Sequence, residues 1–348
     1  MAYSTISKPS LHFNTKLYTG NSSTNAQTGV GFQPDWIWFK RRDSAAQHSL
    51  FDVVRGVTKQ LSSNLNSAET TISDALTSFD SDGFTLGADS GNYINLNSAT
   101  YAAWNWKAGG TGSANSDGDI ASTVSANTTA GFSVVKWTSN GSNSDTIGHG
   151  LGVAPKIVLY KRYDASNNWY WLYKYVDGTL DYLHLNLNNA KADLTLGTYG
   201  FTTSTTITNL GFGNNDSLIA YCFAEKKGYS KFGSYVGNGN ADGTFVYTGF
   251  KPAYVLIKDT TTAGSGHSWC VWDNKRSTSN PTTKLLLPDA TDSEYTITDP
   301  IDFYSNGFKI RDTNGSRNDS GSTYIYMAFA KEPFVANETT NGVPATAR

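Results

Sequence analysis

The sequence predicts an all-β fold of three tandem, antiparallel β-sandwich-like repeats, and three observations lead to this prediction. The first is a phrase that occurs three times at intervals of roughly one hundred residues, which is typical of a repeated module. It consists of a glycine, a hydrophobic residue, a proline and an apolar run closed by lysine. The copies read GFQPDWIWFK at 31–40, LGVAPKIVLYK at 151–161 and GFKPAYVLIK at 249–258.

The second observation is that further landmarks follow each phrase in the same order. A Gly-Phe pair comes next, and then an apolar run in which we match Ala103, Ala220 and Ala328. The third observation is an aromatic residue followed by turn residues upstream of each phrase, at 18–21, 137–141 and 235–239. Chance does not readily give four landmarks in one order three times, so we expect one module used three times.

Each landmark has a physical reason to belong to a β structure. Proline fixes φ and lacks an N–H, so it suits the entrance of a strand, while glycine permits the tight turn before it. The apolar runs are rich in Ile, Val, Tyr and Trp, which pack well on a pleated surface, and they are too short for typical helices. Clusters of Ser, Asn, Asp and Gly supply the turns at 80–83, 139–145, 237–243 and 314–322.

The order of these segments predicts the organisation of the chain. Polar residues with a proline precede the first copy, a Gly/Ser/Asn-rich stretch follows it, and residues 226–229 run directly from the second copy into the third. We therefore expect repeats 2 and 3 to share an interface. The expected segments are an N-terminal arm (1–15), repeat 1 (16–108), a linker (109–130), repeat 2 (131–228), repeat 3 (229–334) and a loose C-terminal tail (335–348).

Composition narrows the class of protein. Aromatic residues make up 13% of the chain and charged residues only 16%, which is typical of rigid extracellular or particle-surface β proteins. The net charge of −2 gives no basic field for nucleic acid, so we expect no nucleic-acid partner. No apolar run is long enough to span a membrane, and the N-terminus lacks the apolar core of a secretory signal. We expect synthesis in the cytoplasm without a signal peptide.

The two cysteines, Cys222 and Cys270, lie inside apolar runs of different repeats. Their number and spacing do not match a zinc knuckle. We interpret them as two buried thiols, and a disulfide between repeats stays open as the alternative.

Several longer motifs point to a known group of proteins. They are FNTKLYTGN at 13–21, TGVGFQPD at 28–35, DVVRGVTK at 52–59, LTSFDSDGF at 76–84, AWNWKAG at 103–109 and GYSKFGSY at 228–235. Over nearly the whole chain, the sequence resembles a family of virion proteins of tailed phages of marine bacteria, including cyanophages and pelagiphages. The resemblance implies a particle component, usually a tail or tail-fibre protein, and supplies no binding residues. The chain departs from a long fibre in having no shaft or coiled-coil extension.

Catalytic motifs are missing from the sequence, so we expect no enzymatic activity and no cofactor. It contains no nucleophile elbow, no HExxH and no phosphate-binding loop. We match His48 with His267 in repeats 1 and 3, and a residue shared between copies favours a role in the scaffold.

Two pairs of carboxylates lie in Ser/Gly-rich turns, where solvated carboxylates are expected. One pair is Asp80 and Asp82; the other is Asp117 and Asp119. A glycosidase would need two carboxylates facing each other across a cleft. Asp117 and Asp119 form a weak candidate for calcium because several oxygen ligands crowd around them, although the spacing of an EF-hand loop is missing.

The best candidate for recognition is an aromatic stripe in repeat 2. Because side chains alternate along a strand, Trp169, Trp171, Tyr173 and Tyr175 fall on one face. If exposed, these rings would suit a sugar or a partner subunit. The alternative is that this face is the core of the sandwich, which Trp269 and Leu50 at the matching positions favour.

These observations together predict a non-enzymatic structural protein located in the virion. We expect a tail fibre, spike or baseplate-associated component that contributes to host attachment by multivalent contact. Its expected partners are copies of itself in a homotrimer, other virion proteins and a host cell-surface glycan. The alternatives are a capsid decoration or head-fibre protein, a capsule-degrading glycoside-active enzyme and a free-standing lectin.

Overall fold

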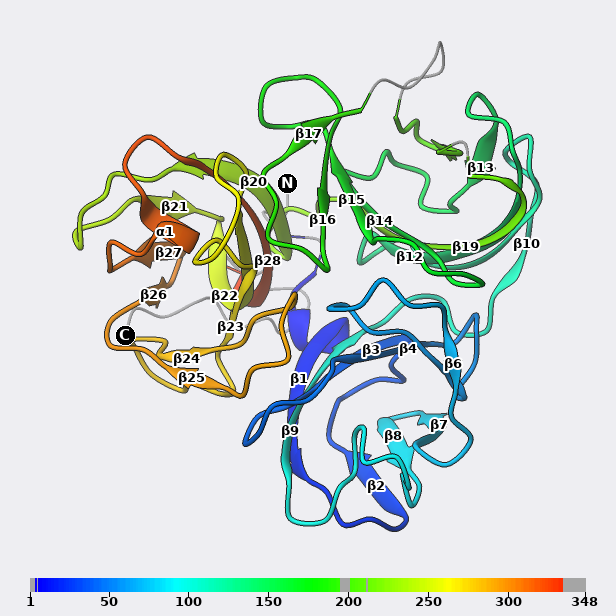
Figure 1. The fold of residues 1–348 in the computed structure, drawn as a ribbon, viewed down its shortest axis with the longest axis horizontal. Helices are drawn as coiled ribbons and strands as arrows, with labels where there is room; N and C mark the ends of the chain where they lie inside the picture. Colours follow the sequence, from blue (N-terminus) through cyan, green and yellow to red (C-terminus); the bar gives the residue numbers. More distant parts are fainter. Residues whose placement is uncertain (1–3, 5, 195–200, 211, 334–348) are drawn as a thin grey trace.

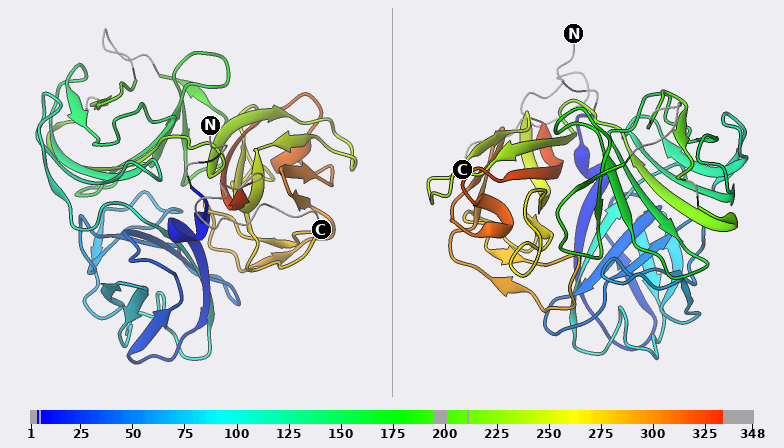
Figure 2. Two further views of the ribbon diagram at one scale, coloured as in Figure 1. Left: turned by 180° about the vertical axis from the view of Figure 1, so that it is seen from behind. Right: turned by 45° about the horizontal axis from the view of Figure 1, so that its top comes forward.

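The computed structural model describes residues 4, 6–194, 201–210 and 212–333, and within them the chain forms three β lobes around a common centre (Figure 1). Two further views show the same three-lobed outline (Figure 2). The strand pairs within each lobe are antiparallel, so the all-β, antiparallel prediction is confirmed. The helices among the described residues are η1 (Pro9–Leu11) and α1 (Gly315–Asn318).

Lobe 1, drawn from blue to cyan in Figure 1, consists of strands β1 to β9. Its inner sheet faces the common centre and has the order β1-β9-β3-β4, and its outer sheet has the order β2-β8-β7. A short ribbon, β5-β6, lies beside them. The strands are β1 (Phe13–Thr19), β2 (Asn25–Thr28), β3 (Trp36–Arg41), β4 (Ser49–Asp52), β5 (Lys59–Gln60), β6 (Thr70–Thr71), β7 (Leu76–Asp80), β8 (Gly83–Leu86) and β9 (Thr100–Trp106).

Lobe 2 consists of strands β10 to β19. Its inner sheet is longer, with the order β10-β11-β12-β19-β14-β15-β16-β17, and its outer sheet is the pair β13-β18. The strands are β10 (Ser113–Asn115), β11 (Ser122–Asn127), β12 (Phe132–Asn140), β13 (Thr146–Gly148), β14 (Ile157–Arg162), β15 (Tyr170–Tyr173), β16 (Asp181–His184), β17 (Ala192–Asp193), β18 (Thr206–Thr208) and β19 (Asn214–Phe223).

Lobe 3 consists of strands β20 to β28 and the short helix α1. Its inner sheet has the order β20-β28-β22-β23, and its outer sheet has the order β21-β27-β26. The strands are β20 (Ser230–Val236), β21 (Phe245–Tyr247), β22 (Phe250–Asp259), β23 (Cys270–Asp273), β24 (Lys284–Leu285), β25 (Tyr295–Thr296), β26 (Ile301–Tyr304), β27 (Gly307–Ile310) and β28 (Thr323–Pro333).

One strand order recurs in the three inner sheets. The order β1-β9-β3-β4 in lobe 1 corresponds to β12-β19-β14-β15 in lobe 2 and to β20-β28-β22-β23 in lobe 3. The three proline phrases lead into or lie within β3, β14 and β22, which take the same place in each sheet. The recurring phrase therefore builds a central strand of each inner sheet.

The inner sheets are buried on both faces. One face packs against the outer sheet of its own lobe, and the other meets the two neighbouring lobes at the centre. Strand β3 accordingly reads WIWFKR, with consecutive apolar side chains that are all buried, as expected where neither face meets water. Representative members of the shared core are Trp36, Trp104, Trp106, Phe132, Trp169, Trp171, Tyr221, Phe223, Tyr254, Trp269, Met327 and Phe329.

Two segments differ from the expected organisation. The stretch 109–130, expected as a linker, contains β10 and β11, which extend the inner sheet of lobe 2 through the pairing of β11 with β12. Val124 on β11 is buried, so alternation along the strand outweighs the Gly/Ser-rich composition around it. The expected arm 1–15 is packed where it is described, because Ile6 enters the shared core and β1 starts at Phe13. The tail 335–348 lies outside the described residues.

The strand ladders fix which residues are equivalent, and they change two matches. Trp36 pairs with Trp106, Ile157 with Phe223 and Tyr254 with Phe329. Counting back along β9, β19 and β28, Tyr326 rather than Ala328 takes the place of Ala103 and Ala220. Counting along β4, β15 and β23, His48 is equivalent to Trp169 and Trp269, so matching it with His267 was wrong.

Both cysteines, Cys222 and Cys270, are free and buried, which agrees with the interpretation as buried thiols. Burial raises the pKa of the Cys222 thiol to about 12. Within the described residues, no helix has the length and apolar character needed to cross a membrane.

Candidate functional site

A buried ion pair of lobe 1 receives a hydrogen bond from lobe 2. Arg55 Nε lies 2.7 Å from Asp52 Oδ2, and the Tyr221 hydroxyl of lobe 2 donates to the same oxygen at 2.8 Å. The guanidinium also reaches Glu69 at 3.2 Å. Since a buried carboxylate is costly unless it is paired and hydrogen-bonded, these contacts hold the two lobes in register.

An equivalent arrangement joins lobes 3 and 1. Asp273 pairs with Arg276, both fully buried, and Trp104 of lobe 1 donates its Nε1–H to Asp273 Oδ2 at 3.0 Å. Burial disfavours the charged carboxylate, but the Arg276 charge and its hydrogen bonds keep the pKa of Asp273 below its ordinary value. Glu294 also contacts Arg276, and its two carboxylate oxygens accept hydrogen bonds from Arg42 of lobe 1. We call each of these Asp-Arg arrangements a latch.

The junction of lobes 2 and 3 has no such latch among the described residues. The ladder positions equivalent to Asp52 and Arg55 hold Tyr173 and Val176, and Met327 stands where Trp104 and Tyr221 stand. The Tyr173 hydroxyl is buried and has no hydrogen-bond partner in the described part of the chain. Apolar packing therefore replaces the ion pair at this junction.

The lysine that closes each phrase is buried, and in lobes 1 and 2 it bonds across a boundary between lobes. Lys40 Nζ donates to the carbonyl of Thr291 in lobe 3 at 2.9 Å, and Lys161 Nζ donates to the carbonyl of Asn66 in lobe 1 at 2.9 Å. Lys258 Nζ stays within its own lobe and donates to the Asp259 carbonyl. Burial lowers the pKa of these lysines from their ordinary value, to about 8, about 7 and about 8 respectively.

A ring nitrogen bridges to a neighbouring lobe at every junction. The indole of Trp169 donates to the Ser62 carbonyl at 2.9 Å, and that of Trp269 donates to the His184 carbonyl at 3.0 Å. At the equivalent place, His48 Nε2 lies 3.0 Å from the Leu287 carbonyl oxygen. His48 also accepts a hydrogen bond from Trp38 at 2.8 Å, and burial lowers its pKa well below the ordinary value.

The aromatic stripe of lobe 2 forms part of the shared core. Trp169, Trp171 and Tyr173 are fully or almost fully buried, and Tyr175 is partly buried against the same cluster. Trp171 packs on Trp269 of lobe 3 with ring centroids 5.0 Å apart. The interpretation as an exposed binding face is therefore wrong, because the neighbouring lobes cover the face on which the sequence periodicity placed these rings.

The candidate calcium residues organise a turn. Asp119 Oδ2 accepts from the backbone and side chain of Thr146, and Asp117 Oδ2 accepts from the Asn115 amide. No group of three or more metal-ligating side chains occurs among residues 4, 6–194, 201–210 and 212–333. Asp119 thus fastens the loop between β10 and β11 to β13, and Asp117 bonds within the turn, which gives both positions a local structural reason.

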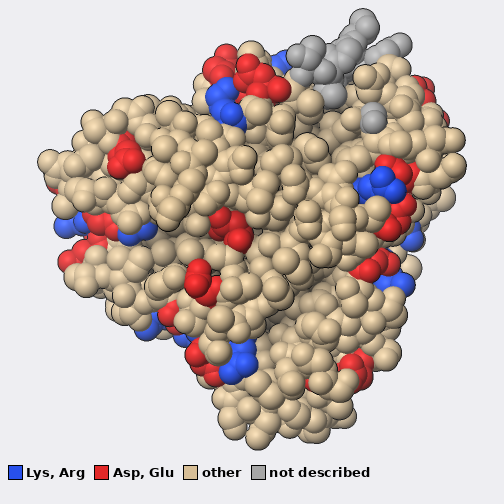
Figure 3. Space-filling model, viewed as in Figure 1, with Lys and Arg blue, Asp and Glu red and all other residues tan. Residues whose placement is uncertain are grey.

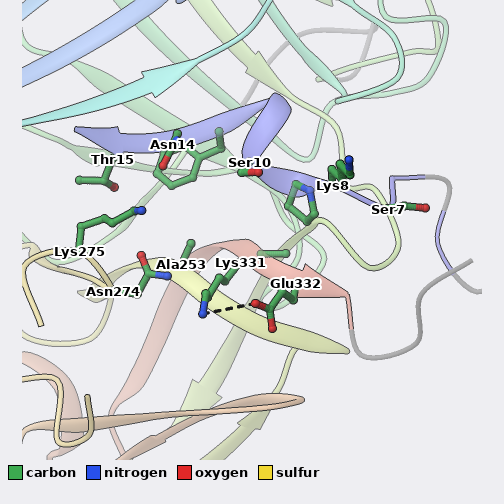
Figure 4. A pocket seen from close by; sticks show the side chains of 13 residues that line it. Ser7, Lys8, Ser10, Asn14, Thr15, Ala253, Asn274, Lys275, Lys331 and Glu332 are labelled. Carbon is green, nitrogen blue, oxygen red and sulfur yellow. Dashed lines mark ion pairs between the residues drawn. The ribbon is translucent and has the colours of Figure 1, made fainter. Parts of the chain in front are cut away.

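A cleft of about 430 Å³ opens between β1 with its preceding segment and lobe 3 (Figure 4). Figure 4 shows Lys275 and Asn274 of lobe 3 facing Asn14 and Thr15 of β1. Lys331 at the edge pairs with Glu332 at 3.3 Å. Sequence reasoning missed this cleft because its two walls are far apart in the chain.

The surface of the face shown in Figure 3 carries few charges, and some of its acidic groups lie beside basic ones while others stand apart from them. Large exposed hydrophobic side chains are concentrated on lobe 3, at Val236, Phe245, Tyr247, Tyr295 and Tyr304. Sequence reasoning also missed this concentration. The available signal was the segment TFVYTG at 244–249, where alternation places both aromatic residues opposite the buried Val246.

Comparison with known proteins gives one family. A family model described as Domain of unknown function (DUF7483) matches residues 8–333. The matched span runs from the residue before η1 to the last residue of β28, so all three lobes lie within it. Searches of curated proteins and of solved structures each gave no match.

Proposed function

The chain belongs to the DUF7483 family, and from the way its three lobes close on one another we propose that it is a non-enzymatic structural component of a tailed-phage particle. We place it in the tail, as a fibre, spike or baseplate-associated component that contributes to host-surface attachment. The proposal rests on one observation: residues at equivalent positions of the three lobes form hydrogen bonds between the lobes. Two of the three closing lysines, and the ring nitrogen at every junction, bond across a boundary between lobes.

Because equivalent residues serve to join the lobes, we favour a rigid structural protein over an enzyme. A catalytic site needs a few unlike groups converging on one cleft. Here the groups shared between copies stay within the scaffold and lock the lobes together. A body closed in this way keeps its outer surfaces in fixed positions, which suits a component that presents surfaces to partners from the outside of a particle.

The position of the described N-terminal segment supports an anchoring end. Ile6 is buried in the shared core, and the start of the blue strand β1 lies near the common centre of the lobes (Figure 2). We propose that this end faces other virion proteins, while the outer sheets face away from the common centre. We propose a homotrimer as the assembly. Because each chain already buries its own inner sheets, such a trimer would form through the outer surfaces of the lobes. Light scattering on the purified protein measures the number of copies.

The three-lobed outline also favours a second candidate, a capsid decoration protein. Such a protein forms a knob on the shell and needs no shaft. Its arrangement of lobes would be the same, and only its place on the particle would differ.

Immunogold labelling of whole particles tests the proposal. Antibodies against the purified chain are expected to label the tail, with particles from a phage deleted for this gene as the control. Label on the head would replace the tail assignment with the capsid decoration candidate, and particles without label would overturn the virion proposal. A parallel assay for reducing ends released from host polysaccharide tests the capsule-degrading alternative, and measurable release would contradict a non-enzymatic role.

A further inference from the structure

Three aromatic side chains lie together on the outward face of the outer sheet of lobe 3. Phe245 is 44% exposed, Tyr247 54% and Tyr304 37%, although each lies within a β-strand. In the sheet ladder, Tyr247 and Tyr304 flank Gly307 from the two neighbouring strands. The Phe245 and Tyr304 rings meet edge to face, with centroids 6.0 Å apart. We call these three side chains the aromatic patch. They lie on β21 and β26, which flank β27 on the side of lobe 3 away from the common centre (Figure 1).

The fold does not require aromatic residues at these places. Lobe 1 has an outer sheet with the same ladder, in which Thr28 and Asp80 flank Gly83. By this register, Ala26, Thr28 and Asp80 of lobe 1 are equivalent to Phe245, Tyr247 and Tyr304. Exposed aromatic residues gain nothing from burial in the core, so the change from small and polar residues to rings needs another reason.

Charged side chains beside the patch balance one another. Lys309 faces Phe245 and Asp302 across the ladder and pairs with Asp242. Arg311 lies 3.5 Å from Asp302, which also accepts a hydrogen bond from the Tyr304 hydroxyl at 3.1 Å. Two carboxylates and two cations thus surround the rings and offer both acceptors and donors, without a net charge that would attract an ionic ligand.

We propose that the aromatic patch binds a neutral glycan of pyranose sugars. A pyranose has an apolar face of C–H groups that fits the flat ring of Tyr or Phe, and its rim of hydroxyls needs alternating donors and acceptors of the kind that surround the patch. A second protein copy fits less well, because a stable interface buries about 800 Å² per partner and three side chains supply only part of that area. The proposal rests on the proposed role in host attachment and names the chemical class of its target.

Isothermal titration calorimetry and saturation-transfer difference NMR on the full chain test this site. The probes are four neutral hexasaccharides: maltohexaose, cellohexaose, laminarihexaose and mannohexaose. We expect at least one to bind, with saturation transfer to the C–H groups of the sugar. Tyr304→Ala and the double variant Phe245→Ala/Tyr247→Ala are expected to weaken that binding at least tenfold.

Tyr295→Ala is the matched control, because Tyr295 lies in the same lobe, is 43% exposed and belongs to β25, outside the patch. This variant is expected to bind like the natural chain. Circular dichroism and thermal unfolding check that each variant keeps its fold, and the milder Tyr304→Leu replaces Tyr304→Ala if the latter unfolds.

Two results would overturn the assignment: no binding of any of the four hexasaccharides by the natural chain, or binding that persists in the patch variants. Neither result bears on immunogold labelling, so a failed glycan site and a failed virion assignment remain distinguishable.

Discussion

At the scale of single residues, the latches decide how tightly neighbouring lobes are held. Asp52 and Asp273 each sit in the core with an arginine three residues later, and each takes a hydrogen bond from another lobe. Removing one partner of such a pair leaves an unpaired charge in a medium that solvates it poorly. The cost of a substitution should therefore depend on burial rather than on the number of contacts alone.

The substitution Asp52→Asn tests this dependence. It keeps the size of the side chain but leaves the buried Arg55 without its nearest countercharge, so we expect the free energy of unfolding to fall by about 3 kcal/mol. The control is Asp43→Asn at the more exposed pair with Arg41, where a loss below about 1 kcal/mol is expected. Urea unfolding measures both, and equal losses at the two sites would contradict the latch.

At the junction of lobes 2 and 3, which has no latch among the described residues, Tyr173 takes the place of Asp52, and we expect a substitution there to cost little stability. The Tyr173 hydroxyl is buried without a partner among the described residues, so Tyr173→Phe is expected to leave stability within about 0.5 kcal/mol or to raise it. Tyr221→Phe removes a hydrogen bond to a buried carboxylate and should cost about 2 kcal/mol. The same unfolding measurement compares the two, and a larger loss for Tyr173→Phe would show that its hydroxyl has an important partner.

At the scale of elements, each central strand is buried on both faces and also carries a buried lysine. Strands β3, β14 and β22 bury both faces, so their side chains cannot alternate between apolar and polar. Each also carries a buried lysine near its end, whose ammonium must find carbonyl oxygens because water is excluded. The run of apolar residues closed by lysine is thus a strand that ends at a lobe boundary.

These lysines predict how stability depends on pH. Their folded pKa values of about 7 to 8 lie below the value of 10.5 that lysine has in the unfolded chain. Between these values the unfolded chain binds more protons, so the free energy of unfolding rises with pH by up to about 1.4 kcal/mol per unit for each lysine.

We expect urea unfolding between pH 7 and 8.5 to show this rise, and Lys161→Met to reduce its slope. The range stops at 8.5 because buried thiols with raised pKa values act in the opposite direction near pH 9. A slope that does not change in Lys161→Met would show that this lysine is charged in the folded protein throughout the range.

At the scale of the whole molecule, the three lobes depend on one another. Each lobe has its own outer core, but the shared core takes residues from all three. An isolated lobe would expose the inner face of its sheet to water. For lobe 3, this face includes Tyr254, Leu256, Met327 and Phe329, whose burial contributes on the order of 10 kcal/mol. That amount is comparable to the entire stability of a typical domain.

The intact chain is therefore expected to unfold in a single cooperative transition. In differential scanning calorimetry, the calorimetric and van't Hoff enthalpies should agree. The fragment 229–333, expressed alone, is expected to lack a cooperative transition, and the intact chain under identical conditions is the control. Separate transitions for the lobes, or a folded fragment, would show that the shared core contributes little.

The sequence predicted local structure better than it predicted surfaces. It identified the β segments, the turns and the two buried thiols from residue type and spacing, which depend on neighbours in the chain. It left the aromatic stripe at 169–175 open between a binding face and the core, because period two states which residues share a face, not what covers that face. It missed the 430 Å³ cleft because no local pattern marks a space between distant segments.

What the sequence determined by itself is the all-β character and the order of its landmarks, since both follow from residue types within a few positions of one another. The tertiary structure alone decided that the lobes close around one core, that 109–130 joins a sheet, and that Trp169 and Trp171 are buried while Phe245 and Tyr304 are exposed. The physical reason is that burial depends on what packs from elsewhere in the chain. Identical alternation gives a core face where another lobe covers it and a surface where none does.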